Sequence, residues 1–138
     1  IHIYIYIYIN IMSCYWNTLI KNIKHNDIKN ILNIKNINPF RFAKELKNKN
    51  KLINTILVNN NKIKEQQQKE NFDHIKEYNP KTVNNGYLCS TCDPFLILIA
   101  NLFSITIINN YIGNIITYKP ISYSRYTITI KNDNGHMW

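Results

Sequence analysis

The apolar positions in the first part of the chain recur at helical spacing. One such stripe consists of Trp16, Leu19, Ile20 and Ile23. These residues fall at i, i+3, i+4 and i+7, which is typical of a helix that buries one face. Ser13 is a suitable N-cap and places Cys14 at the first helical position. The pattern therefore predicts a helix that opens at Cys14.

Three further segments before residue 60 have helical features. Asp27 is positioned to cap a short helix, whose apolar residues are Ile28, Ile31 and Leu32. Asn38-Pro39 is a start signal for the next helix, whose apolar stripe is Phe40, Ala43 and Leu46. Residues 52–57 carry Leu52, Ile53, Ile56 and Leu57, which favour another helical turn or two. We therefore expect a helical first half.

The middle of the chain is polar and then strongly apolar. Residues 59–85 include the run Lys-Glu-Gln-Gln-Gln-Lys-Glu at 64–70, which indicates an exposed helix or a mobile insertion. Asn84-Asn85-Gly86 marks a turn. Asp93-Pro94 is an N-cap followed by proline at the first helical position, so residues 95–103 are predicted to form a buried helix.

The last third of the chain has the character of strands. Residues 104–108, 115–118 and 126–130 are rich in β-branched and aromatic residues and are separated by turn residues. We therefore predict an α+β fold, with helices packed on a small, mainly antiparallel C-terminal sheet of three strands. His136 would follow the last strand.

Composition changes how the charge is interpreted. The chain has 138 residues and a net charge of +9, with 27 Ile, 24 Asn and 15 Lys but only 2 Arg. Isoleucine, asparagine and lysine have A- and T-rich codons, so the skew indicates nucleotide bias. Because the lysines are scattered among asparagines, we expect a solvated surface rather than a nucleic-acid groove. No apolar run approaches the roughly 18 residues of a membrane span, so no membrane association is expected.

The first eleven residues alternate isoleucine with tyrosine or histidine over most of their length. This is an ideal strand pattern, but an ATATAT repeat read in frame encodes the same Ile-Tyr alternation. We therefore interpret residues 1–11 as a repeat-derived segment or a fragment edge. The chain is short enough to form one domain, assigned here to residues 12–138 and expected to be a monomer.

The three cysteines indicate a reducing compartment. Their number is odd and too small for a disulfide framework, which favours the cytoplasm, or the host cytoplasm if the protein is viral. Cys89-Ser90-Thr91-Cys92 has the C-x-x-C spacing of zinc and redox sites. A second pair of zinc ligands is not evident, so the preferred interpretation is two thiols in the loop before Asp93.

Cys14 and His136 form a candidate catalytic pair. The positive end of a helix dipole favours thiolate, which is the nucleophilic form of cysteine. An imidazole close to it would act as general base and then protonate the leaving amine. The backbone N–H of Cys14 would contribute to an oxyanion hole. This scheme requires no metal and no cofactor.

These blocks, taken in order, resemble the ovarian tumour (OTU) family of cysteine proteases, within the papain-like superfamily. Ser-Cys-Tyr-Trp-Asn-Thr at 13–18 looks like the nucleophile block of the family, residues 93–107 are similar to its helix-then-strand block, and residues 127–137 look like its closing strand and histidine. Phe-Arg-Phe-Ala at 40–43 is a weaker likeness to an arginine-bearing helix. The resemblance implies an OTU-like fold over residues 12–138, with Cys14 and His136 catalytic.

The resemblance also implies a function, which is cleavage of ubiquitin or ubiquitin-like protein conjugates. Three positions depart from the family pattern, because Ile11 and Met12 stand where Asp and Gly are usual and Trp138 stands where Asp or Asn is common. The residue that orients the histidine is therefore not identifiable, although Asn10 and Asn134 are candidates. The alternatives are an inactive OTU-like remnant that binds ubiquitin or another partner, a papain-like viral leader or polyprotein protease, and a lysine-rich nucleic-acid-binding module.

Overall fold

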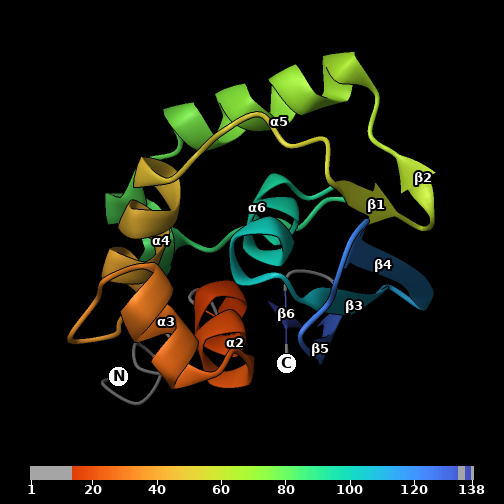
Figure 1. Cartoon of the computed structure of the whole chain (residues 1–138). Helices are drawn as coiled ribbons and strands as arrows, with labels where there is room; N and C mark the ends of the chain where they lie inside the picture. The colour runs from red at the N-terminus through yellow and green to blue at the C-terminus, as the bar shows by residue number, and fades with distance from the viewer. Residues whose placement is uncertain (1–13, 134–135, 138) are drawn as a thin grey trace.

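The computed structural model describes residues 14–133 and 136–137 and has an α+β architecture (Figure 1). Its helices are α2 (Cys14–Asn22), α3 (His25–Ile31), α4 (Pro39–Asn48), α5 (Glu65–Glu77), the 3₁₀ helix η1 (Pro80–Asn85) and α6 (Pro94–Phe103). Its strands are β1 (Ile56–Val58), β2 (Asn61–Lys62), β3 (Thr106–Tyr111), β4 (Asn114–Pro120), β5 (Thr127–Asp133) and β6 (His136–Met137). The predicted fold class is confirmed at this level.

The strands form one mixed sheet in the order β2-β1-β4-β3-β5-β6. β3 and β5 run parallel, whereas the other neighbouring strands are antiparallel. The prediction of a mainly antiparallel sheet is confirmed, but the prediction of three strands is wrong. The sequence pattern missed β1, β2 and β6, which are the shortest strands.

Helix α6 lies at the centre of the molecule, with α2, α3 and α4 on one side and the sheet on the other (Figure 1). Every residue of α6 except Asn101 and Leu102 is buried. The buried apolar residues of the described chain form one cluster, to which α2 contributes Tyr15, Trp16 and Leu19, with Ile23 directly after the helix. The predicted buried helix and the predicted stripe of α2 are thus confirmed, apart from the half-buried Ile20.

Three local predictions are wrong. The segment around Ile56 is strand β1 rather than helix, because Asn59 and Asn60 adopt left-handed backbone angles and turn the chain back into β2. Phe40 is 38% exposed, because the apolar face of α4 runs through Phe42, Ala43 and Leu46 instead. Asp27 does not cap α3; the N-cap position is Lys24, whose side chain makes no capping bond.

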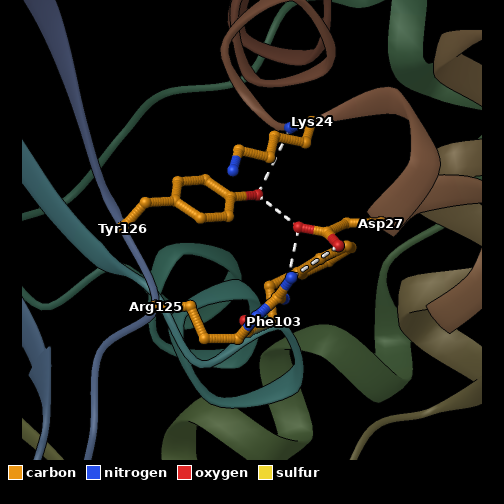
Figure 2. A network of polar contacts seen from close by, with 5 residues as sticks. All are labelled: Lys24, Asp27, Phe103, Arg125 and Tyr126. Atoms are coloured by element: carbon orange, nitrogen blue, oxygen red, sulfur yellow. Dashed lines mark hydrogen bonds and ion pairs between the residues drawn. The ribbon is translucent and has the colours of Figure 1, made fainter.

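Asp27 instead belongs to a polar cluster that joins α3 to the start of β5 (Figure 2). The Arg125 guanidinium contacts both carboxylate oxygens of Asp27, at 2.9 and 3.2 Å, and donates to the carbonyl of Phe103 at 3.1 Å. The Tyr126 hydroxyl donates to Asp27 at 2.6 Å and accepts from the Lys24 amide at 3.3 Å. The cluster therefore links α3, the end of α6 and the start of β5.

The charges of this cluster follow from its contacts. Hydrogen bonding from Arg125, the largest influence, lowers the pKa of Asp27. Burial, together with the bond to Asp27, raises the pKa of Tyr126 to about 12. At neutral pH, Asp27 is therefore an ionised acceptor and Tyr126 a protonated donor.

We expect Tyr126→Phe to lower the free energy of unfolding by about 1 kcal/mol at pH 7, because it removes the hydrogen bond to the Asp27 carboxylate and the acceptor of the exposed Lys24 amide. The measurement is urea denaturation. Tyr123→Phe is the matched control, since Tyr123 is 71% exposed. Because the pKa of Asp27 is lowered, the ionised carboxylate stabilises the folded state above about pH 4. This stabilisation is lost as the pH falls through the folded-state pKa of Asp27. The difference between wild type and Tyr126→Phe should therefore shrink in acid, and equal effects of the two substitutions would contradict the assignment.

Candidate active site

The two residues predicted to be catalytic lie on elements that pack together. Cys14 is the first residue of α2 and is half-buried. His136 belongs to β6, which pairs with β5 through Asp133↔His136 and Asn132↔Met137. Helix α2 contacts both β5 and β6 (Figure 1). The fold thus brings the backbone segments that carry Cys14 and His136 side by side.

Several predicted parts of the site lie outside the described residues. They include the proposed N-cap Ser13 and both candidates for the orienting residue, Asn10 and Asn134. The imidazole of His136 is also outside the described side chains. The distance from the Cys14 sulfur to that ring therefore stays a prediction.

A buried carboxylate lies next to the start of α2. Asp93 has 0% exposure and caps α6, accepting from the amides of Phe95 at 2.9 Å and Leu96 at 3.4 Å. The same oxygen, Oδ1, accepts from the hydroxyls of Tyr15 at 3.2 Å and Tyr87 at 3.3 Å. Asp93 thus connects α2, α6 and the loop before α6.

Burial shapes the titration of this cluster. It raises the pKa of the Asp93 carboxyl, although hydrogen bonds from the Cys89 thiol, the helix amides and Tyr15 partly offset this effect. Burial is also the main reason why the pKa values of the Tyr15 and Tyr87 hydroxyls are raised well above their ordinary value. Both tyrosines therefore stay protonated and can donate to Asp93.

Tyr15 points into the protein and does not line an open cleft. Its side chain is only 2% exposed, and its ring packs against Trp16 and Tyr87 with centroid distances of 4.9 and 4.2 Å. The hydroxyl is the reason, because bonding to the buried Asp93 requires Tyr15 to point inward. Trp16 is in the core, as predicted.

Cys89 and Cys92 are thiols and not a disulfide. Cys89 is buried, and burial, together with the neighbouring Asp93, raises its pKa far above the ordinary value for a thiol. Asn109 and Asn132 donate hydrogen bonds toward the sulfur, but they only partly offset that shift. The Cys89 thiol therefore stays protonated at neutral pH, which makes it a poor nucleophile.

The described part of the chain contains no group of three or more His, Cys, Asp or Glu side chains placed to hold a metal ion. Cys89 and Cys92 therefore find no third ligand among these residues. His25 and His74 are exposed, and His2 lies outside the described residues.

Sequence reasoning identified Asp93 as a helix cap but missed its link to Tyr15. One feature of the sequence could have indicated that Asp93 is buried and needs such partners. Residues 94–100, directly after Asp93, are apolar on every side of the helix. A helix of that kind is covered at its N-terminus as well as along its length. Its cap must then be buried and needs hydrogen-bond donors from neighbouring elements.

We found no matching family model, no matching curated protein and no matching solved structure for this chain. Within residues 14–133 and 136–137, none of the helices combines the length and the apolar character required to cross a bilayer.

The raised pKa of Asp93 predicts a pH-dependent comparison with Asp93→Asn, which keeps an acceptor for the helix amides but cannot ionise. Because the pKa of Asp93 is raised, its contribution to the free energy of unfolding is fully present below about pH 4. That contribution is reduced as the pH rises through the folded-state pKa of Asp93. Relative to wild type, Asp93→Asn should therefore gain stability as the pH rises from about 4. Melting temperatures at a series of pH values test this, and a constant difference between the two proteins would contradict it.

Proposed function

We propose that residues 12–138 form an OTU-like, papain-like cysteine protease domain that cleaves ubiquitin or ubiquitin-like protein conjugates. The observation that carries the proposal is the packing of α2, which begins at Cys14, against β6, which contains His136. A cysteine at a helix start beside a histidine on a terminal strand is the arrangement that thiol protease chemistry needs. Cys14, Cys89 and Cys92 are not joined in disulfides, which agrees with action in the cytoplasm.

The proposed reaction proceeds through a thioester. His136 takes the proton of the Cys14 thiol, and the sulfur attacks the carbonyl carbon of the isopeptide bond. The carbon–nitrogen bond breaks, and His136 gives the proton to the leaving lysine amine. A water molecule, deprotonated by His136, then hydrolyses the thioester, which releases the modifier with a free carboxylate and restores the thiol.

Each tetrahedral intermediate carries a negative oxygen. Backbone N–H groups at the start of α2, including that of Cys14, are the proposed donors to it, because the first N–H groups of a helix have no partner within the helix. Cys89 has no place in this scheme, because its buried thiol stays protonated.

A second candidate function is binding of ubiquitin without catalysis. It is favoured by Ile11, Met12 and Trp138, which replace the residues that resemblance to the family leads one to expect. A histidine without an orienting partner is a less effective general base, because part of its population is in the wrong tautomer or orientation.

The test is reaction of the purified chain with a ubiquitin probe that carries a C-terminal electrophile. We expect a covalent adduct that is abolished in Cys14→Ala and forms about 100-fold more slowly in His136→Ala, a typical loss for a general base. Cys92→Ala and His25→Ala are the matched controls and should react at the wild-type rate.

The outcomes of this experiment separate the protease function from the ubiquitin-binding function. Folded protein that binds ubiquitin in a titration but forms no adduct would support the binding function. Protein that neither binds nor reacts would overturn both, and an adduct that survives Cys14→Ala would refute Cys14 as the nucleophile.

A further inference from the structure

Asp93 is the only acidic side chain that is buried among the described residues, and the catalytic scheme above does not use it. It is bonded to Tyr15, the residue directly after Cys14. We propose that Asp93 is a positioning residue, which fixes the first turn of α2, and with it the Cys14 sulfur, by accepting the hydrogen bond of the Tyr15 hydroxyl. This inference rests on the function proposed for Cys14.

The first turn of α2 needs an external anchor. The helix has only nine residues, and helices this short are not stable by themselves in water. The first amides of a helix also have no intrahelical partners, so its N-terminal turn is held less firmly than its middle. Contacts from the rest of the protein therefore decide where Cys14 is placed.

Tyr15 and Asp93 supply such an anchor. They are 78 positions apart in the sequence, and the bond between them is buried at 3.2 Å. Asp93 is itself held by the amides of Phe95 and Leu96, in the central helix of the core. The hydroxyl of Tyr15 is thus bonded to the most enclosed part of the fold.

The structure provides a matched comparison in Tyr87. Its hydroxyl donates to the same oxygen of Asp93, at 3.3 Å against 3.2 Å, and its ring packs against that of Tyr15. Tyr87 comes from the loop before α6 and not from α2. Tyr15→Phe and Tyr87→Phe therefore each remove one bond to Asp93. Tyr87→Phe also removes a contact with His74 at 3.2 Å, but only Tyr15→Phe loosens the helix of Cys14.

The experiment compares Tyr15→Phe and Tyr87→Phe with wild type by two measurements. In reaction with the electrophilic ubiquitin probe, we expect Tyr15→Phe to lower the limiting rate of adduct formation about tenfold, while the half-saturating probe concentration is unchanged. A tenfold loss of rate corresponds to about 1.4 kcal/mol of activation free energy. Tyr87→Phe should keep the wild-type limiting rate, although the melting temperatures of both variants are lowered.

Hydrogen–deuterium exchange is the second measurement and does not depend on activity. Amides of α2 should exchange several-fold faster in Tyr15→Phe than in Tyr87→Phe. If wild type forms no adduct, the proposed protease function fails, but this exchange difference still decides whether Asp93 holds α2. Equal exchange in the two variants would overturn the positioning role, as would equal limiting rates with an active wild type.

Discussion

The fold depends on the need to cover a helix that is apolar on every side. Helix α6 has no polar face to turn toward water, so the sheet, α3, α4 and α5 pack around it. Trp16 of α2 adds a ring contact with Phe95. Its N-terminal amides are enclosed as well, and an enclosed amide must have a partner. Asp93 meets that need, and it brings a buried carboxylate into the centre of the protein. The placement of Tyr15 and Tyr87 around it is a consequence of covering α6.

The sheet extends this arrangement toward the candidate site. β3 follows α6 directly and pairs in parallel with β5, so the last third of the chain is aligned with the central helix. The contact of Asp27 with Arg125 and Tyr126 then fixes the start of β5 against α3. β6 pairs with β5 and reaches α2. Two independent connections therefore determine where the strand of His136 lies.

The sequence predicted the features that local chemistry determines. Proline signals with capping residues located α4 and α6, and the helical stripe located α2. It failed where tertiary contacts override local preference, as in β1, which pairs with β4 across the sheet. It also missed the inward orientation of Tyr15, because no local pattern indicates a partner 78 residues away. The start of a helix at Cys14 was predictable from the sequence, but the residues that pack around that helix were not.

The meeting of α2 with β6 has a consequence for how the protein is made. α2 leaves the ribosome long before β5 and β6, and its neighbours in the sheet are therefore absent during most of synthesis. Contacts between such distant segments form late, after the local helices and hairpins. A nascent chain would thus carry the thiol of Cys14 without the strand of His136 beside it. Any activity that needs both segments would begin only when the strand of His136 has emerged.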